Sequence, residues 1–313
     1  MFDDQKIGVI IPAFDEEEAI GAVIDAVPPF VDVIAVVDDG STDRTAEVAR
    51  RAGAVVLSHE RNRGLGAAFD TGRRYALQTG VDVMVNIDGD AQFDPADIEK
   101  LIAPVISGRA GFVTASRFKD AALVPSMSRT KLLGNRLMSW TISRLTGRRF
   151  HDVSCGFRAY SRDTLLRMNL FGDFTYTQEM FLDLAFKNIS ILEVPVAVRG
   201  SREHGSSNIS SNLLRYGWQT MKIIIRTLRD YRPLRLFAGL AAVLFAGSLA
   251  PGIFLLVHYL HTGSFSPHKW AGFLSAFLLL LSVLSIVLGF ILDMFARMRM
   301  NQEEILSILR RSD

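Results

Sequence analysis

The sequence predicts an α/β domain built on a doubly wound, mostly parallel sheet, followed by a two-helix transmembrane hairpin. Two observations carry this prediction. Up to about residue 200, short apolar runs alternate with segments of helical spacing, which is the pattern of parallel α/β proteins. Beyond residue 235, the runs 236–257 and 270–292 contain no charged residue. Each is long enough to cross a hydrocarbon core of about 30 Å as a helix.

The composition excludes several classes of protein. Hydrophobic residues make up 49% of the 313 residues and charged residues 22%, which excludes disorder over most of the chain. The net charge of +2 is close to balance and argues against a nucleic-acid partner. Cys155 is the single cysteine, so no internal disulfide can form, which fits a protein that faces the reducing cytosol.

Apolar runs and helical segments give the order of elements in the first part of the chain. The runs are typical of strands buried on both faces of a sheet. The expected strands are 6–12, 31–37, 54–58, 82–87 and 112–115, and the expected helices are 16–27, 42–53, 65–79 and 94–107. Strands that alternate with helices form a parallel sheet, and such sheets bind ligands just past the carboxyl ends of their strands.

Acidic segments follow three of the expected strands, at that ligand-binding edge. They are PAFDE (12–16), DDGS (38–41) and DGDAQ (88–92). Each alone is better explained as an ordinary turn, and only their placement at successive strand ends predicts a site. Close carboxylates repel one another unless a cation compensates, and their oxygens suit Mg²⁺ or Mn²⁺. The segment 64–66 lacks the spacing of a dinucleotide fingerprint, which argues against a nicotinamide enzyme.

As a set, six motifs resemble a known family. They are VIIPAFDE (9–16), VDDGSTD (37–43), DGD (88–90), SRF (116–118), DVSCGFR (152–158) and REHGSS (202–207). The first three are similar to the GT-A type nucleotide-sugar domain of family 2 inverting glycosyltransferases. The others resemble its dolichyl-phosphate mannose synthase and polyprenyl-phosphate glycosyltransferase branch. The resemblance covers roughly residues 6 to 210. Cys155 stands where the branch often has Ser, and Phe14-Asp15 where Tyr-Asn is common.

The resemblance implies transfer of a hexosyl group, with inversion, from a nucleotide-diphosphate sugar to a polyprenyl phosphate. GDP-mannose, UDP-glucose and UDP-N-acetylglucosamine remain open as donors, and dolichyl and undecaprenyl phosphate as acceptors. The residues that match the donor site are Pro12, Phe14, Glu16, Asp38, Asp39 and Asp88. The D-x-D-x-Q residues that match the site of Mg²⁺ or Mn²⁺ are Asp88, Asp90 and Gln92.

Cations are expected to hold the acceptor, because a phosphate monoester is mostly dianionic at pH 7 and needs no general base. Arg117 and Arg202 lie in motifs that match the family, SRF (116–118) and REHGSS (202–207). With Asp90, they are the expected catalytic residues. The other expected acceptor contacts are Arg129, Lys131, Arg158, Glu179 and Ser206. A solvated surface charge is the alternative for some of these basic residues. A structural role is an equal alternative for Glu179, on an expected helix 176–187. Three histidines lack metal-ligand spacing and are not expected to bind a metal: His59, His151 and His204.

Four segments give the expected domain organisation. They are a catalytic domain (1–210), an amphipathic interfacial helix (211–235), two transmembrane helices (about 236–259 and 269–292, within 236–292) and a tail (293–313). The alternative to the hairpin is a pair of helices buried in a protein core. Two long uncharged runs joined by a short loop favour the hairpin over this alternative. Neither run is expected to be a signal peptide. The arginines that flank the hairpin are Arg226, Arg229, Arg232 and Arg235 before it, and Arg297, Arg299, Arg310 and Arg311 after it.

These flanking arginines predict a multi-pass protein of the cell membrane, with the catalytic domain and both termini in the cytoplasm. The segment 211–235 places basic residues beside an apolar helical face, which is typical of a helix in the headgroup layer. The segment 131–150 combines apolar and basic residues in a similar way and is expected to form a second helix that dips into the headgroup layer and guides the prenyl chain. A helix packed on the catalytic domain is the alternative for both. The expected partners are the donor, the lipid acceptor and the bilayer, and a homo-oligomer remains open.

Three rival functions share some of these features. A processive polysaccharide synthase would carry a Q-x-x-R-W motif and more spans, and neither occurs in this sequence. A transferase with a hydroxyl acceptor, in glycan or polysaccharide assembly, would need a general base, and Glu179 keeps that alternative open. An inactive nucleotide-sugar-binding membrane scaffold is the third, and the intact D-x-D-x-Q set argues against it.

Overall fold

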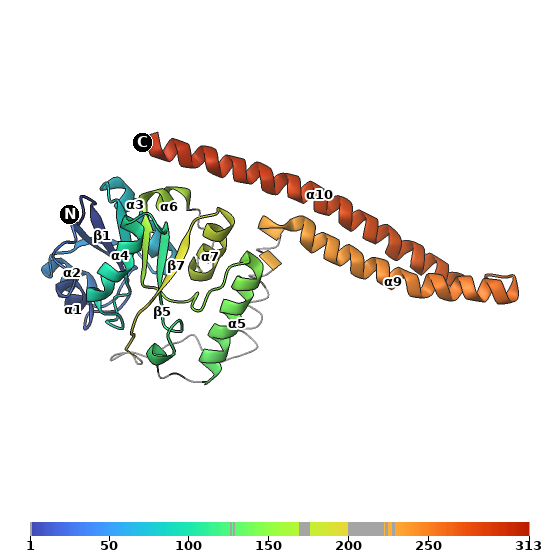
Figure 1. The fold of residues 1–313 in the computed structure, drawn as a ribbon, viewed down its shortest axis with the longest axis horizontal. Coiled ribbons are helices and arrows are strands. Elements are labelled where there is room, and N and C mark those ends of the chain that lie inside the picture. Colours follow the sequence, from blue (N-terminus) through green and yellow to red (C-terminus); the bar gives the residue numbers. More distant parts are fainter. Residues whose placement is uncertain are drawn as a thin grey trace. The chain divides into compact units, whose positions relative to one another are not determined.

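Two units make up the chain in the computed structural model, one of sheet and helices and one of long helices (Figure 1). The first comprises residues 1–218 and 310–313, and the second comprises residues 219–309. The structure describes residues 2–125, 127, 129–168, 176–199, 222, 225–226 and 229–312. Arg202 and Ser206, two of the expected site residues, lie outside the described residues.

A seven-stranded sheet is the frame of the first unit. The strands are β1 (Ile7–Ala13), β2 (Val33–Asp38), β3 (Val55–Ser58), β4 (Val83–Asn86), β5 (Phe112–Ser116), β6 (Arg158–Ser161) and β7 (Ile191–Pro195). Their order is β3-β2-β1-β4-β6-β5-β7, and β6 runs antiparallel to both of its neighbours while the other pairs are parallel. The expected doubly wound, mostly parallel sheet is confirmed. The strands β6 and β7 are additional to those that the apolar runs predict.

Helices cover both faces of the sheet. The helices of this unit are α1 (Ile20–Asp25), α2 (Thr45–Arg51), α3 (Leu65–Gln78), α4 (Ile98–Ile106), α5 (Arg129–Thr146), α6 (Arg162–Arg167) and α7 (Tyr176–Phe186). Helices α1, α2 and α4 share one hydrophobic cluster with Val9 and Ile11 of β1. Helix α3 covers the opposite face, where a Cβ on Gly72 would collide with the side chain of Ile10. Because successive side chains of a strand point to opposite faces, β1 is buried along its whole length, as its apolar run predicts.

The four expected helices of the sheet region are present, but three of them begin later than their spacing predicts. The fourth, α4, follows a 3-10 turn at Pro95–Asp97, and the first two follow turns that join two loops. In place of the first helical turns, backbone N–H groups of the loop after β1 donate hydrogen bonds to side chains of the loop after β2. The N–H of Glu16 donates to Thr45 Oγ1 at 2.8 Å, and the N–H of Glu17 donates to Asp43 Oδ2 at 3.1 Å. These bonds stabilise turns after β1 and β2 where a helix was expected.

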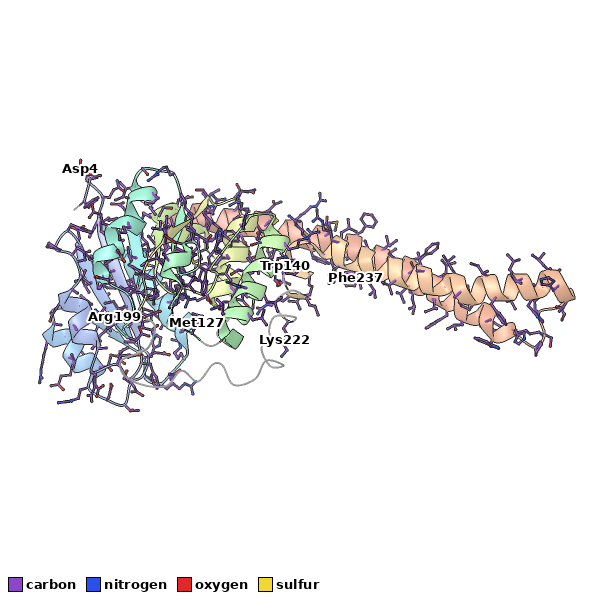
Figure 2. All side chains as sticks on the ribbon, turned by 60° about the horizontal axis from the view of Figure 1, so that its bottom comes forward. Asp4, Met127, Trp140, Arg199, Lys222 and Phe237 are labelled. Carbon is purple, nitrogen blue, oxygen red and sulfur yellow. The ribbon has the colours of Figure 1, made fainter. Side chains whose placement is uncertain are left out.

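Helix α5 confirms a helix within the expected segment 131–150, although it ends at Thr146, and its apolar side chains lie in two different surroundings. Met138 and Ile142 are buried where α5 packs against α7. Leu133, Leu137 and Trp140 are 60%, 47% and 64% exposed, and Trp140 is labelled in Figure 2. The helix therefore packs on its own unit with one face and keeps an apolar face exposed. Contact of that exposed face with lipid stays a prediction.

Two long helices, α9 (Pro233–Thr262) and α10 (Lys269–Ser312), make up most of the second unit, and the last residues of α10, from 310 on, belong to the first unit. Both are long and apolar enough to cross a membrane, and only 11% of each apolar stretch is buried. They contain the expected spans 236–259 and 269–292. The segment 293–312, expected as a tail, continues α10 without a break. Of the expected interfacial helix, residues 222, 225–226 and 229–231 are helical, and the other residues before 229 lie outside the described residues.

Hydroxyl groups join the two long helices. Ser275 Oγ donates to the carbonyl oxygen of Ser248 at 2.8 Å, and Ser282 Oγ donates to that of Ala241 at 2.9 Å. A Cβ on Gly252 would lie 2.8 Å from Ser275 Oγ, so the backbones approach closely at this point. Small residues and interhelical hydrogen bonds of this kind are typical of helix pairs in membranes.

Candidate active site

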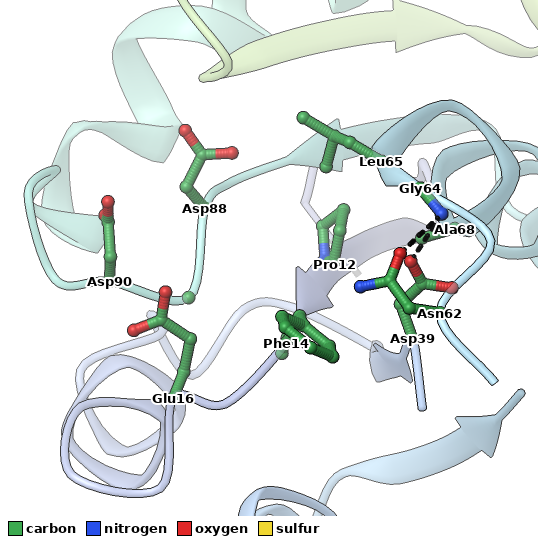
Figure 3. Close-up of a pocket in the computed structure, with 12 residues that line it drawn as sticks. Pro12, Phe14, Glu16, Asp39, Asn62, Gly64, Leu65, Ala68, Asp88 and Asp90 are labelled. Carbon is green, nitrogen blue, oxygen red and sulfur yellow. Dashed lines mark hydrogen bonds between the residues drawn. The ribbon is translucent and has the colours of Figure 1, made fainter. Parts of the chain in front are cut away.

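A cavity of about 360 Å³ opens at the carboxyl ends of β1, β2 and β4 (Figure 3). The strand order reverses between β1 and β4, and doubly wound sheets bind ligands at such a switch point. The cavity is lined by Pro12, Ala13, Phe14, Glu16, Asp39, Asn62, Gly64, Leu65, Ala68, Asp88, Gly89 and Asp90. The expected site residues that it brings together are Pro12, Phe14, Glu16, Asp39, Asp88 and Asp90.

Two expected residues of this group do not line the cavity. Asp38 is buried, and its Oδ1 accepts a hydrogen bond from the N–H of Ser41 at 3.0 Å, so it holds the turn after β2. Gln92 contacts the site through its backbone, since its N–H donates to Asp90 Oδ1 at 3.2 Å. The lining residues that the sequence analysis missed are Asn62, Gly64, Leu65 and Ala68. They follow β3, whose pairing with β2 is the signal that could have found them.

Hydrogen bonds between two loops fix the segment of Phe14 and Glu16. The N–H of Asp15 donates to Ser41 Oγ at 3.1 Å, and Asp15 Oδ1 accepts from the N–H of Thr42 at 2.8 Å. Asp15 has a left-handed backbone with φ of +53°, and aspartate tolerates this better than most residues. The carboxylate side chains at the carboxyl end of β1 are thus placed by the loop that follows β2.

Asp43 belongs to the same pair of loops and is held as a carboxylate. Burial alone would raise the pKa of Asp43, but hydrogen bonds from Thr45 and Glu17 outweigh this effect and hold the pKa below its ordinary value. The Asp43 Oδ1 atom accepts from the N–H of Thr45 at 2.9 Å, and Oδ2 accepts from the N–H of Glu17 at 3.1 Å. A charged acceptor strengthens both bonds between the loops.

Asp39 lies at one end of the cavity, with Asn62 and Gly64 beside it (Figure 3). Its side chain is 5% exposed and is held by His59 Nδ1, at 2.6 Å, and by backbone N–H groups of Arg63 and Gly64. The backbone N–H of Asp39 donates to the carbonyl of Ala13 at 2.9 Å, which ties this end of β2 to β1.

Glu16, Asp88 and Asp90 lie at the other end (Figure 3). Among the described residues there is no group of three or more His, Cys, Asp or Glu that could hold a metal ion. Two carboxylates still fit Mg²⁺ or Mn²⁺, because such ions are commonly held by one or two carboxylates with substrate phosphates and water in the remaining positions. Ala91, with φ of +56°, makes the tight turn that presents Asp90. The oxygen atoms of Asp88 and Asp90 therefore fit a hard divalent cation.

Gly156 packs directly against one of these carboxylates. A Cβ at this position would lie 2.7 Å from Asp88 Oδ1, which is too close for any side chain. The amide of Asn86, at the end of β4, donates to the carbonyl of Gly156 at 2.9 Å. The motif 152–158 thus contributes a backbone surface that positions Asp88.

Arg117 follows β5 and forms a bidentate ion pair with Asp152. Its Nε lies 2.6 Å from Asp152 Oδ2, its Nη2 lies 2.9 Å from Oδ1, and Nη2 also donates to Ser154 Oγ at 2.6 Å. Asp152 is fully buried. Burial alone would raise the pKa of Asp152, but the hydrogen bonds and charge of Arg117 outweigh burial and lower it. The family-like motifs 116–118 and 152–158 meet in this pair, and a contact of Arg117 with the acceptor stays a prediction.

Arg158 is fully buried, so the alternative of a solvated surface charge is wrong for this residue. Its Nε donates to the carbonyl of Cys155 at 2.6 Å, and its guanidinium lies over the rings of Phe112 and Phe181 at 5.7 and 5.3 Å. In this arrangement Arg158 holds the segment around Cys155, and its expected contact with the acceptor phosphate stays a prediction.

The other expected acceptor residues lie on two helices. Glu179 is half-buried on α7, which begins at Tyr176 as predicted. Arg129 and Lys131 belong to the first turn of α5, and their side chains lie outside the described part of the chain. Their contacts with an acceptor stay predictions.

A buried polar network around Glu193 was not predicted from the sequence. Glu193 of β7 is 7% exposed and accepts hydrogen bonds from the N–H of His151 at 2.9 Å and of Asp152 at 2.8 Å. His151 Nδ1 lies 2.7 Å from the same carboxylate. This network anchors the segment that carries Asp152. No motif or spacing marks Glu193, since it lies within a short apolar strand.

Comparison with known proteins gives the family. Residues 8–167 match the profile of the family described as glycosyl transferase family 2. The chain belongs to this family. It is 33% identical to the UDP-N-acetylglucosamine–dolichyl-phosphate N-acetylglucosaminyltransferase of Methanococcus voltae, over 62% of this chain and 85% of that protein. It is 29% identical to the polyprenol monophosphomannose synthase of Mycolicibacterium smegmatis, over 67% and 83% respectively.

A solved structure is also similar to this chain. It is glucosyl-3-phosphoglycerate synthase from Mycobacterium tuberculosis, in complex with Mn²⁺, UDP and glucosyl-3-phosphoglycerate. The TM-score is 0.54 at 26% identity, over 72% of this chain and 79% of that one. The predicted family and the predicted fold class are both confirmed.

Proposed function

We propose that this glycosyl transferase family 2 member moves a hexosyl group from a nucleotide-diphosphate sugar to a polyprenyl phosphate at a membrane surface, with inversion at the anomeric carbon. The observation that carries the proposal is the cavity at the switch point, with Asp39 at one end and Asp88 and Asp90 at the other, in a chain that also has two membrane-length apolar helices. Relatives whose names include a dolichyl or polyprenol acceptor support it.

The donor fits the cavity lengthwise. Asp39 and Asn62 bind the base, Phe14 packs beside it, and the sugar diphosphate extends toward Asp88 and Asp90. Those two carboxylates, with Gln92 adjacent, hold Mg²⁺ or Mn²⁺, which supplies the positive charge that stabilises the departing nucleotide diphosphate. The complexes of the solved relative with Mn²⁺ and UDP support this arrangement.

The acceptor needs orientation rather than deprotonation. A phosphate monoester is mostly dianionic at pH 7, so its oxygen attacks the anomeric carbon directly. Arg117 and Arg202 offset the negative charge of acceptor and donor, with Arg129, Lys131 and Ser206 as further contacts. Asp152 and Ser154 position Arg117 for this role through the ion pair and hydrogen bond described above.

The two apolar helices anchor the enzyme where its acceptor lies. Arginines flank both helices on one side, so the positive-inside rule favours a catalytic unit and termini in the cytoplasm. A cysteine introduced at Ser264 should then react with an impermeant thiol reagent added to intact cells, whereas buried Cys155 should not. Protection of the introduced cysteine in intact cells, with reaction only after lysis, would contradict this orientation.

A transfer assay with two matched acceptors tests the function. The full chain in detergent, with Mn²⁺ and labelled nucleotide-sugar, should label polyprenyl phosphate and leave the corresponding polyprenol unlabelled, because the alcohol lacks the ionised nucleophile. Excess EDTA should stop the reaction. Transfer to the polyprenol at a similar rate would favour the alternative of a hydroxyl acceptor, and the absence of transfer to any acceptor would favour an inactive binding protein.

A further inference from the structure

The carboxylate of Asp39 is bound by the protein at most of its accepting positions. Its Oδ1 accepts from His59 Nδ1 at 2.6 Å and from the N–H of Arg63 at 3.0 Å. Its Oδ2 accepts from the N–H of Gly64 at 2.7 Å. A carboxylate oxygen offers two lone pairs. Within the described part of the chain, Oδ1 is therefore saturated, and Oδ2 keeps one accepting position.

Close backbone packing fixes these donors. Gly40 has a φ of +75°, and a Cβ there would lie 2.7 Å from the backbone nitrogen of Asn62. Gly64 has a φ of +90° and directly precedes α3, which aims its N–H back at Asp39. Glycine adopts such angles without steric cost. The segment 61–64 is thus held against the turn after β2, with little freedom to withdraw its N–H groups from the carboxylate.

His59 is the side-chain member of this set, and both of its ring nitrogens are engaged. The side chain is 7% exposed. Nδ1 carries a proton, because a carboxylate oxygen only accepts, and Nε2 lies 2.9 Å from Thr71 Oγ1 of α3. The backbone N–H of His59 donates to the carbonyl of Asp38 at 2.9 Å. The ring is therefore locked with its N–H on Asp39 Oδ1.

Asn62 supplies a donor beside this acceptor. Its Oδ1 accepts from the N–H of Gly64 at 3.1 Å, which turns its NH₂ group into the cavity on the side of Phe14 (Figure 3). This end of the cavity thus presents one accepting position, on Asp39 Oδ2, next to one amide donor, on Asn62.

We propose that His59 is a specificity-determining positioning residue that restricts the donor to a uracil nucleotide. The inference rests on the proposed function, which places the donor base at this end of the cavity. Uracil presents a single N–H flanked by carbonyl oxygens, which matches Asp39 Oδ2 and the Asn62 amide. Guanine presents two adjacent N–H donors. The second would face Asp39 Oδ1, whose two accepting positions are already used by His59 and Arg63. Cytosine presents an accepting nitrogen, which repels the carboxylate.

Nucleotide affinities of the unmodified full chain test this inference. UDP, GDP and CDP are titrated calorimetrically into the protein in detergent with Mn²⁺. A buried donor without a partner weakens GDP binding, and an accepting nitrogen that faces the carboxylate weakens CDP binding, so UDP should bind at least about tenfold more tightly than GDP or CDP. GDP binding as tight as UDP would overturn the inference and leave the proposed function intact. If none of the three nucleotides binds, the proposed function is overturned and the inference falls with it.

Two substitutions of His59 isolate its role. His59→Phe keeps an aromatic ring but frees Asp39 Oδ1, so the UDP-to-GDP affinity ratio should fall by at least about fivefold. His59→Asn keeps an N–H near the position of Nδ1 and should retain most of the ratio. His261→Phe, at an exposed histidine of α9, is the matched control and should leave the ratio unchanged.

An unchanged ratio in a folded His59→Phe protein would overturn the role of His59, as would equal loss of the ratio in the phenylalanine and asparagine variants. If His59→Phe does not fold, Thr71→Val replaces it, because that change removes the bond to Nε2 and keeps the ring. A lowered UDP-to-GDP ratio in Thr71→Val supports the proposal, and an unchanged ratio contradicts it.

Discussion

The carboxylates that line the cavity differ in their surroundings from those of the buried network around Asp152. Asp88 and Asp90 are half-buried and line the cavity. Asp152 and Glu193 are buried, and the protein neutralises or binds both, the first through Arg117 and the second through His151 and backbone N–H groups. The first set lines the cavity that we propose binds the donor, and the second set holds the chain together through an ion pair and hydrogen bonds.

This difference indicates which residues contribute mainly to stability and which contribute mainly to ligand binding. The two sets meet at the motif 152–158, because its Asp152 is anchored in the buried network while its Gly156 packs on Asp88. Substitutions in the network should therefore act first on folding, and substitutions at the cavity should act first on ligand binding and transfer.

The largest expected effect follows the loss of Arg117. Arg117→Ala leaves Asp152 buried without its ion-pair partner, which should lower the free energy of unfolding by about 3–5 kcal/mol. Replacing both partners, as Arg117→Met with Asp152→Leu, should recover much of that loss. Denaturant unfolding of the full chain measures both. An Arg117→Ala protein with wild-type stability and lost transfer would mean that Arg117 serves the acceptor alone.

Asp90→Ala should show the opposite pattern. Loss of a carboxylate that we propose binds the metal should lower turnover by at least about 10²-fold, while the unfolding midpoint stays near that of the wild type. Asp25→Ala, at an exposed residue of α1, is the matched control and should change neither quantity. Steady-state transfer rates and thermal unfolding measure the two effects. Full turnover of the wild type in excess EDTA would refute the metal requirement.

Glu179→Gln should have a smaller effect, because an ionised phosphate has no proton for a base to remove. General-base catalysis contributes typically 10²–10⁴-fold, and the loss should remain below that range. The rate of the wild type should fall below about pH 6, where the acceptor phosphate gains a proton. A thousandfold loss with normal donor affinity and intact fold would favour a hydroxyl acceptor.

The smallest expected effect concerns Cys155. Burial, reinforced by the charge of Asp152, raises the pKa of the Cys155 thiol to about 12 from an ordinary value of 9.0. The unfolded chain loses this proton first, so the stabilising contribution is complete below pH 9 and is lost as the pH rises toward 12. Between pH 7 and 10, stability should therefore fall less in Cys155→Ala than in the wild type, by at most about 1.4 kcal/mol. Identical pH slopes in the two proteins would contradict this.

The sequence predicted the cavity carboxylates well and the buried network poorly, for a physical reason. Glu16, Asp39 and Asp88 lie within three residues of the ends of β1, β2 and β4, and parallel topology gathers strand ends at one edge. The pairing of Arg117 with Asp152 joins residues 35 positions apart, which no local pattern marks.

The missed strands have a similar explanation. Strand β6 begins with a fully buried arginine, Arg158, so it gives no apolar run. Strand β7 carries the buried Glu193 at its centre. Gly64 belongs to the segment 64–66, whose spacing does not match a dinucleotide fingerprint. Its actual contribution, an N–H on Asp39, depends on how the segment after β3 packs on the turn after β2.

Mass spectrometry of the lipid product tests the central claim most directly. The full chain is incubated with a uridine-diphosphate sugar, Mn²⁺ and polyprenyl phosphate, and the lipid fraction is analysed together with the anomeric configuration of the bound sugar. The predicted product is the polyprenyl phosphate with one added hexosyl unit, joined through the phosphate and inverted relative to the donor, and it should disappear in Asp90→Ala. A lipid product without the sugar–phosphate bond, or one with retained configuration, would contradict the proposed transfer.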